Sequence, residues 1–211
     1  MFRLRFIALF VTGCAASSAD PNALILEITR SYPTDGSYGY DWPKTGGWDG
    51  TTEAVTVDGI PLTQGDPRKR SYCCGLTYEV FLKAHRALGP AAPPDRLKEL
   101  KLRWYGNSKL APERRMLVAF ALESMGFGAR PASLDEARPG VFVQFWRGNG
   151  SGHSAIFLGW VREEGRIAGI TYWSSQKSTN GIGVATERVG GPDGVRPEEI
   201  FLARLTSGTG R

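Results

Sequence analysis

A cysteine just ahead of a long amphipathic segment sets the first limit on how this chain folds. Apolar residues recur at helical spacing from Leu76 to Leu88, which predicts a helix with one buried face. The predicted buried positions are Leu76, Val80, Ala84, Ala87 and Leu88. Gly89 and Pro90 end this helix, because glycine accepts a left-handed cap and proline cannot continue a helix. Cys73 therefore lies at or just before the first turn.

The position of Cys73 favours a reactive thiol. The first turn of a helix has unpaired backbone N–H groups and the positive end of the helix dipole, and both stabilise a thiolate. Such sites lower the pKa of a cysteine from about 8.5 to about 3.5–7.5. The alternative is a small apolar residue buried under the helix.

Residues 1–19 have the pattern of a secretory signal peptide. Arg3 and Arg5 form a positive region, and a short apolar segment from Phe6 to Val11 follows. This segment is too short to span a bilayer. The sequence therefore predicts an exported protein, periplasmic or extracellular.

Two cleavage patterns are open at the end of this leader. Val11-Thr12-Gly13-Cys14 resembles a bacterial lipobox, in which Cys14 would become a lipidated first residue and anchor the protein to a membrane. Ser17-Ser18-Ala19 instead suits ordinary cleavage before Asp20.

Export also bears on the other two cysteines. Exported proteins normally pair their cysteines, but only the adjacent Cys73 and Cys74 remain after the leader. A disulfide between neighbouring residues departs far from normal bridge geometry. We therefore expect a free thiol at Cys73.

The order of the predicted elements indicates an α+β fold with an antiparallel sheet. The predicted helices span 20–29, 76–88, 95–104 and 112–125, the predicted hairpin 54–62, and the predicted strands 141–146, 153–160, 167–173 and an edge strand at 199–205. Nothing in the composition divides residues 20–205 into two domains, and residues 206–211 are predicted to be a frayed tail.

Residues 31–53 are predicted to form an ordered loop rich in aromatic side chains. Its aromatic residues either cover the edge of the core or line a cleft. Tyr40 and Trp48, together with Tyr72 beside the cysteine, are the candidate substrate-binding residues.

The chain has two histidines, His85 and His153. His85 lies within the predicted helix and is predicted to be a surface residue. His153 opens a predicted strand directly after a glycine-rich turn, at the end of a sheet, where it could act as the base for Cys73.

The strand register suggests a third group. If the hairpin turns at Glu164-Gly165, His153 lies opposite Gln176, and opposite residues point to the same side of a sheet. A change of one residue in the loop would place Ser175 there instead. Gln176 could accept a hydrogen bond from the imidazole ring. Alternatively, residues 174–179 are an ordinary polar loop.

Composition argues against several classes of function. The formal charge of +5 becomes +3 without Arg3 and Arg5, with 24 basic against 21 acidic residues. This scattered surplus does not predict nucleic-acid binding, although it weakly suits an anionic polymer such as a cell wall. The sequence has no convincing cluster of metal ligands, and the predicted chemistry needs no metal or cofactor.

Three segments of the chain share one family resemblance. Cys73-Cys74-Gly75-Leu76 resembles the Cys-Ser-Gly-Leu that starts the catalytic helix of the NlpC-type cell-wall peptidases, and residues 137–145 resemble the Leu-x-Pro-Gly-Asp-Leu-Val-x-Phe strand of that family. Residues 152–159 are similar to its Gly-His-Val-Gly-Ile-Tyr-Leu-Gly strand. The resemblance covers roughly residues 70–176 and implies a papain-like fold, with Cys73 as nucleophile and His153 as base.

The chain also departs from the family. Tyr72 stands where the family usually has Asp, and Val141 replaces an acidic residue after Pro-Gly. Residues 95–105 add a helix between the cysteine and the histidine, and Tyr40, Trp42 and Gly46-Gly47 match the family's Tyr-x-Trp-Gly-Gly only loosely.

The resemblance implies hydrolysis of amide bonds in peptidoglycan stem peptides, by an endopeptidase or an N-acetylmuramoyl-L-alanine amidase. Two other functions remain open. One is a lipid-anchored cell-wall binding protein that has lost catalysis. The other is an acyltransferase that uses the same thioester chemistry.

Overall fold

The computed structural model describes residues 20–43, 47–89, 92–107 and 113–206. The predicted leader, Cys14 and Gly46 lie outside these ranges. The helices are α1 (Pro21–Arg30), α2 (Cys73–Leu88), α3 (Pro94–Trp104), α4 (Glu113–Met116) and α5 (Val118–Ser124), and the 3-10 turns are η1 (Leu134–Glu136) and η2 (Lys177–Thr179). The strands are β1 (Thr56–Val57), β2 (Ile60–Pro61), β3 (Gly128–Ala129), β4 (Phe142–Arg147), β5 (Gly152–Glu163), β6 (Arg166–Gln176), β7 (Gly181–Arg188) and β8 (Val195–Leu205).

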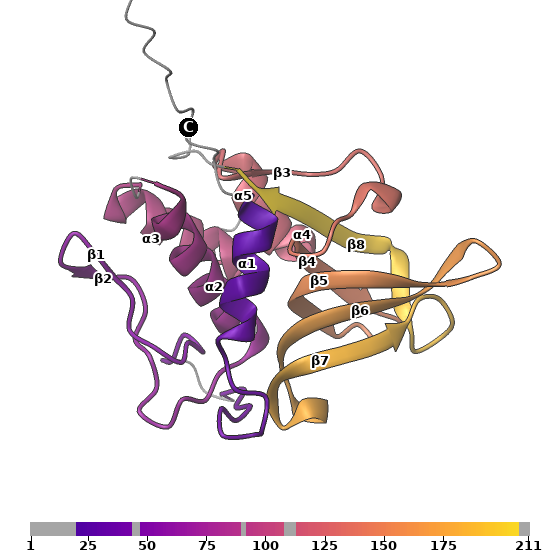
Figure 1. Cartoon of the computed structure of the whole chain (residues 1–211), viewed down its shortest axis with the longest axis horizontal. Coiled ribbons are helices and arrows are strands. Elements are labelled where there is room, and N and C mark those ends of the chain that lie inside the picture. Colours follow the sequence, from indigo (N-terminus) through magenta and orange to yellow (C-terminus); the bar gives the residue numbers. More distant parts are fainter. Residues whose placement is uncertain (1–19, 44–46, 90–91, 108–112, 207–211) are drawn as a thin grey trace, which may run out of the picture.

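The described residues form helices and antiparallel sheets, an α+β architecture as predicted. Six strands form the main sheet in the order β3-β8-β4-β5-β6-β7. The helices lie on one side of this sheet (Figure 1). A large apolar core lies between the helices and the sheet, and a second cluster, which includes Phe145, Phe157 and Tyr172, covers the other face.

Two strands differ from their predicted places. Residues 199–205 were expected to form an edge strand, but β8 is longer and pairs with both β3 and β4, so it lies inside the sheet. The strand β7 was not predicted. Its positions from Val184 to Arg188 are exposed or half-buried. Because few of them are apolar, the sequence shows no clear strand pattern there.

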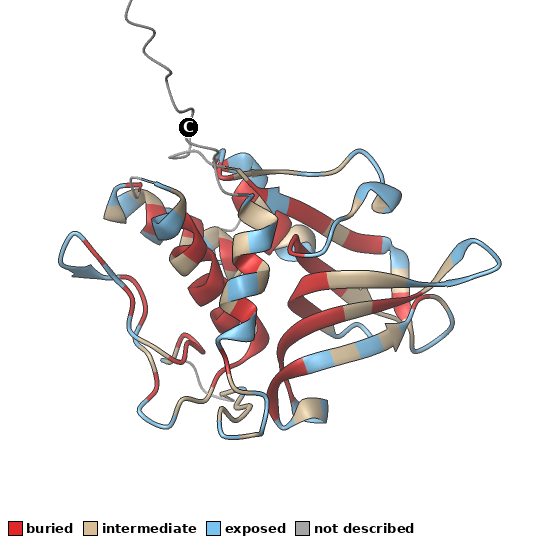
Figure 2. Cartoon of the chain, in the orientation of Figure 1, coloured by how far each residue is buried: buried red, intermediate tan, exposed pale blue. Residues whose placement is uncertain are grey.

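Helix α2 is the centre of the molecule. It is buried on nearly all sides from Cys73 to Leu82, more than the single buried face that was predicted (Figure 2). Burial decreases toward its end, where Ala87 is exposed and Leu88 is half-buried. Gly89 ends the helix with a φ of 152° and a ψ of −157°, so it does not form the predicted left-handed cap. Because α2 is covered on nearly all sides, packing against the surrounding segments fixes its position.

The prediction that His85 lies at the surface was wrong. His85 is only 4% exposed, its ring stacks on Phe81, and its Nε2 accepts a hydrogen bond from the Ala92 amide. Ala92, which follows α2 in the chain, lies against this ring. Burial lowers the pKa of His85, so the neutral ring is favoured.

The segment predicted as one helix over 112–125 is broken. Leu117 has a φ of 37° and separates α4 from α5. Residues 108–112, where the predicted helix begins, lie outside the described part of the chain.

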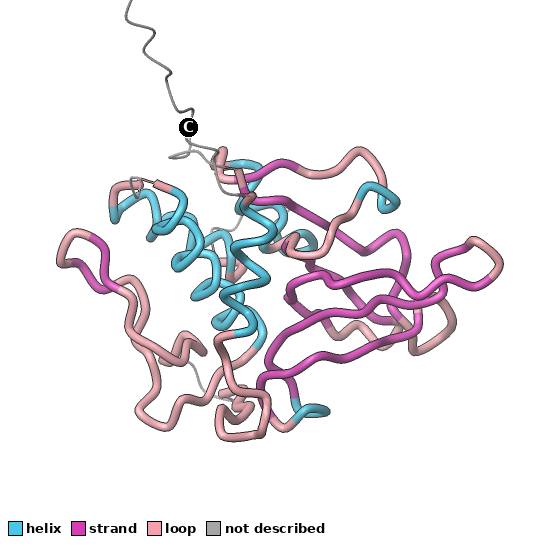
Figure 3. Tube along the Cα trace, in the orientation of Figure 1, coloured by secondary structure: helices cyan, strands magenta, loops and turns pink. Residues whose placement is uncertain are grey.

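The described residues between α1 and α2 are mostly loop, as predicted for residues 31–53, and the small β1–β2 hairpin turns at Asp58-Gly59 (Figure 3). Gly75 allows this loop to approach the helix closely, because a Cβ atom there would lie 2.2 Å from the carbonyl oxygens of Asp49 and Gly50. Any side chain at position 75 would push the loop away from Cys73.

Glu79 fastens the same loop to α2. Its carboxylate has no exposed surface and accepts hydrogen bonds from the Tyr32 hydroxyl at 2.6 Å and from the Thr52 amide at 2.6 Å and hydroxyl at 2.9 Å. Lys83 lies 2.9 Å from the same carboxylate. Because buried charge must be paired, these contacts hold three segments of the chain together.

We predict that Glu79→Gln lowers the free energy of unfolding by about 2–3 kcal/mol, because the amide loses one acceptor oxygen and brings two donors into a site already full of donors. Urea unfolding measures the change. Glu163→Gln is the matched control, since Glu163 is exposed and should change stability by less than about 0.5 kcal/mol. An equal effect of the two substitutions would show that the Glu79 contacts do not hold the loop.

Candidate active site

The site forms where β5 and β6 separate. The paired residues of these strands run from Glu163 opposite Arg166 to Ile156 opposite Trp173, and the strand ends beyond this point are not paired with each other. The N-terminus of α2 contacts both strands at this point. Ser175 Oγ, on β6, donates a 3.0 Å hydrogen bond to the Ser71 carbonyl, and the Ser154 amide, on β5, bonds to the Cys73 sulfur.

The predicted side-chain contact between His153 and Gln176 is present, although both residues lie beyond the paired part of β5 and β6. His153 Nε2 lies 3.0 Å from Gln176 Oε1. Two irregularities lie between the hairpin and this pair: Leu158 is an extra residue on β5 and Ala168 is an extra residue on β6. Because one extra residue on each strand cancels the other, the simple register from the turn still predicts the correct partner. Ser175, the alternative, bonds to Ser71 instead.

This hydrogen bond determines which ring nitrogen faces the cysteine. The oxygen of an amide can only accept, so Nε2 of His153 donates to Gln176 and Nδ1 remains for Cys73. The side chains of Cys73, His153 and Gln176 therefore form one chain of contacts. A nucleophile, a base and a group that orients the base are the parts that cysteine-dependent acyl chemistry needs.

The surroundings of Cys73 favour the thiolate. A hydrogen bond from Cys74, then the charge of His153 and hydrogen bonds from His153 and the Ser154 amide, hold the pKa of Cys73 well below that of an ordinary thiol, although burial opposes this. The contact with Cys73, followed by burial, raises the pKa of Cys74. Of the two neighbouring thiols, Cys73 is therefore the one that ionises.

Cys74 contacts a pair of polar side chains on the sheet, Ser154 and Gln144, that the sequence did not predict as part of the site. The Cys74 sulfur lies 3.9 Å from that of Cys73 and 3.3 Å from Ser154 Oγ, which in turn donates to Gln144 Oε1 at 2.6 Å. Gln144 and Ser154 are opposite residues of β4 and β5. The strand alternation could have placed them on the helix side, but nothing in the sequence showed that Cys74 would meet them.

His153 lies on the other face of the sheet. Successive residues of a strand point to opposite faces, so Ser154 faces α2 while the His153 ring packs between Phe145 and Tyr172, with ring centroids 5.6 Å and 5.2 Å away. Both aromatic residues belong to the second apolar cluster. The thiol and the imidazole therefore reach each other at the end of the sheet, each supported by a different core.

The predicted aromatic residues lie near the cysteine, but they are not equally accessible. Tyr72 is only 6% exposed and donates through its hydroxyl to the Trp48 carbonyl. Tyr40 is half-buried, and burial followed by the charge of Cys73 raises the pKa of its hydroxyl. Trp42 packs on Tyr72 at 4.7 Å and is 55% exposed, so it is the large ring here that solvent reaches most.

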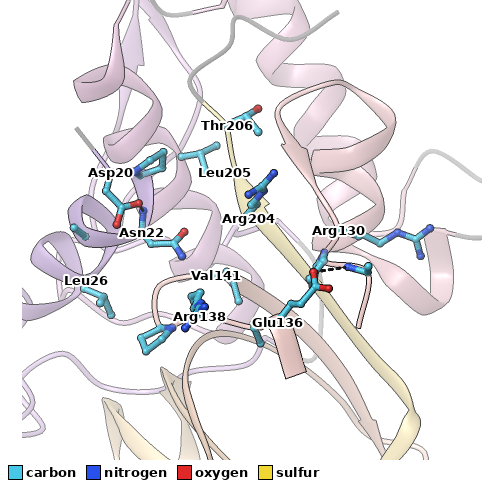
Figure 4. A pocket seen from close by; sticks show the side chains of 16 residues that line it. Asp20, Asn22, Leu26, Arg130, Glu136, Arg138, Val141, Arg204, Leu205 and Thr206 are labelled. Carbon is cyan, nitrogen blue, oxygen red and sulfur yellow. Dashed lines mark hydrogen bonds between the residues drawn. The ribbon is translucent and has the colours of Figure 1, made fainter. Parts of the chain in front are cut away.

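A hollow of about 1160 Å³ lies elsewhere, at the start of α1. Figure 4 shows it bordered by Asn22, Glu136 and Arg204. Its lining does not include Cys73 or His153. At the candidate site itself, Cys73, His153 and Gln176 are each only 7% exposed, so all three residues are buried.

Within the ranges that the structure covers, no group of three or more His, Cys, Asp or Glu side chains could hold a metal ion. None of the described helices has both the length and the apolar character needed to cross a membrane. Comparisons with protein-family models, curated proteins and solved structures found no match to this chain.

We predict that iodoacetamide labels Cys73, and not Cys74, at a pH well below the usual thiol pKa of about 8.5. The lowered pKa of Cys73 keeps the thiolate present until the pH falls through that lowered value, whereas Cys74 stays protonated. Peptide mass spectrometry at several pH values measures both sites. His153→Ala should slow the labelling of Cys73 near pH 6 about tenfold. Identical pH profiles for the two cysteines would contradict this assignment.

Proposed function

We propose that this protein is a cysteine hydrolase with a papain-like arrangement that cleaves amide bonds. The observation that carries the proposal is the contact chain from Cys73 through His153 to Gln176, which joins the start of a helix to two strands. The side chain of Gln176 supports a functional role. Its Nε2 is buried without a hydrogen-bond partner among the described residues, whereas a structural amide normally satisfies both ends.

The proposed mechanism follows from the positions of these groups. The Cys73 thiolate attacks the carbonyl carbon of the amide and forms a tetrahedral oxyanion. The backbone N–H of Cys73, in the first turn of α2, helps to hold this charge. The protonated His153 gives its proton to the leaving amine as the C–N bond breaks, which leaves a thioester.

Water completes the cycle. Neutral His153 takes a proton from a water molecule, which attacks the thioester carbon and releases the acid and the Cys73 thiolate. The hydrogen bond to Gln176 keeps Nε2 protonated, so that Nδ1 accepts and donates the proton. Each residue thus has one role: Cys73 as nucleophile, His153 as acid and base, and Gln176 as the group that orients the ring.

The proposed substrate is the stem peptide of peptidoglycan, cut by endopeptidase or N-acetylmuramoyl-L-alanine amidase action. The support is the resemblance of three segments to NlpC-type peptidases, together with the predicted export signal. Tyr40 interacts with the charge of Cys73, and Trp42 and Trp48 pack on Tyr72, the residue before Cys73. These rings are surfaces on which a sugar or peptide could pack. We place the enzyme outside the cytoplasm, either free or anchored through Cys14.

The departures from the family do not count against catalysis. Tyr72 packs against Trp42 and Trp48 and leaves the start of α2 without a side-chain cap. Val141 is 4% exposed within the second apolar cluster, where an acidic residue would be costly. Neither substitution removes a member of the Cys73–His153–Gln176 chain.

We predict that the wild-type protein releases fragments from purified sacculi and that Cys73→Ala abolishes the release. His153→Ala should slow it about 10²-fold or more, because proton transfer is lost. Gln176→Ala should slow it less, whereas Gln64→Ala, the same change at an exposed glutamine, should not slow it. Mass spectrometry of the soluble fragments measures the rates.

Other results would separate the alternatives. An acyl group passed to an added amine, with no free acid, would identify an acyltransferase. Binding to sacculi without release, unchanged by Cys73→Ala, would identify a cell-wall binding protein. Either result would contradict the hydrolase proposal.

A further inference from the structure

Four side chains from three strands lie on the side of His153 away from the cysteine: Phe145, Arg147, Tyr172 and Glu187. The His153 ring packs on Phe145 of β4 and Tyr172 of β6. Tyr172 donates through its hydroxyl to Glu187 of β7. Arg147 of β4 binds both oxygens of Glu187, each at 2.6 Å, and its guanidinium carbon lies 5.1 Å from the Phe145 ring centre.

This group of four side chains contains a charged pair, Arg147 and Glu187, that is not part of the contact chain from Cys73 to Gln176. The side chains of Arg147 and Glu187 are only 18% and 25% exposed, so water screens their charges poorly. Burial alone would raise the pKa of Glu187, but hydrogen bonds from Arg147 and Tyr172 and the charges of Arg147 and His153 hold it below the usual value. Glu187 is therefore a carboxylate at neutral pH, and it interacts with the His153 charge.

We propose that Glu187 is a positioning residue that favours the protonated form of His153, and that Arg147 limits this effect by neutralising part of the carboxylate charge. The inference rests on the proposed function, in which protonated His153 gives a proton to the leaving amine. Packing between Phe145 and Tyr172 fixes the ring, and the carboxylate behind Tyr172 supplies the negative charge.

The other groups around His153 do not account for the same effect. The Cys73 thiolate, at the start of α2, is the partner of His153 in the proposed reaction. Tyr40, beside Cys73, keeps its proton because burial and the charge of the Cys73 thiolate raise its pKa. Gln176 and Tyr172, both on β6, carry no charge at neutral pH, since burial and the bond to Glu187 raise the pKa of Tyr172. Among these neighbours, the Arg147–Glu187 pair supplies the charges that are not consumed in the reaction.

Opposite shifts are expected from the two members of the pair. Removing the carboxylate leaves Arg147 unpaired near the ring, so the ring should lose its proton at lower pH. Removing the guanidinium leaves the carboxylate unpaired, so the ring should keep its proton to higher pH. General loosening of the structure would not produce shifts of opposite sign.

The test is NMR titration of the histidine ring signals in the full protein, which needs no substrate. The chain has only two histidines, and buried His85 serves as an internal reference. Glu187→Gln should move the midpoint of the His153 titration down by about half a pH unit or more, and Arg147→Gln should move it up by a similar amount. The double variant should return close to wild type. Glu163→Gln, about 33 Å away along β5, should move nothing.

Each outcome decides the inference. A shift of His153 in the same direction in both single variants, or no shift in either, would overturn it. Unchanged His85 signals would show that the variants fold, and if Glu187→Gln unfolds, the upward shift in Arg147→Gln still tests the sign. Failure of the sacculus assay with intact opposite shifts would instead count against the proposed function alone.

Discussion

The N-terminus of α2 contacts both β5 and β6 beyond the paired part of these strands, and the rest of the site depends on these contacts. The helix arrives with the Cys73 sulfur, which accepts a hydrogen bond from the Ser154 amide of β5, while Ser175 of β6 binds the turn before the helix. The loop that contains Asp49, Gly50 and Thr52 packs on Gly75 and bonds to Glu79, and these contacts hold the helix in this position. Moving the helix would separate Cys73 from both strands at once.

The two apolar cores have different parts in the site. The core between the helices and the sheet carries Cys73 and Cys74, and the cluster on the opposite face surrounds the ring of His153. The Cys73 thiol and the His153 ring meet at the end of the sheet although Ser154 and His153, neighbouring residues of β5, point to opposite faces. The geometry of the site therefore depends on the packing of both faces, and loss of either core would displace Cys73 or His153.

Local patterns were enough to predict part of this arrangement. Helical spacing and the turn signals placed Cys73 at the start of a helix and His153 on a strand, and counting from the turn at Glu164-Gly165 found Gln176. That count was correct because the extra residues Leu158 and Ala168 cancel, which no local pattern shows.

The rest depends on contacts between distant segments. His85 was predicted to lie on the exposed side of a helix, but the contact with Ala92 helps to bury it. Glu187 lies on β7, a strand whose exposed and half-buried positions gave no apolar pattern, so its pairing with Arg147 from β4 could not be predicted. Both cases are polar side chains whose surroundings are determined by residues 7 and 40 positions away.

The doublet of cysteines follows from the same geometry. The side chain at position 74 faces Ser154 and Gln144 inside the helix-side core, so it must be small and able to share a hydrogen bond. A thiol satisfies both needs and also donates to the Cys73 thiolate. Serine, which the resembling family has at this position, would donate as well but with a smaller atom. Cysteine at position 74 thus keeps a hydrogen-bond donor beside Cys73 in the first turn of α2.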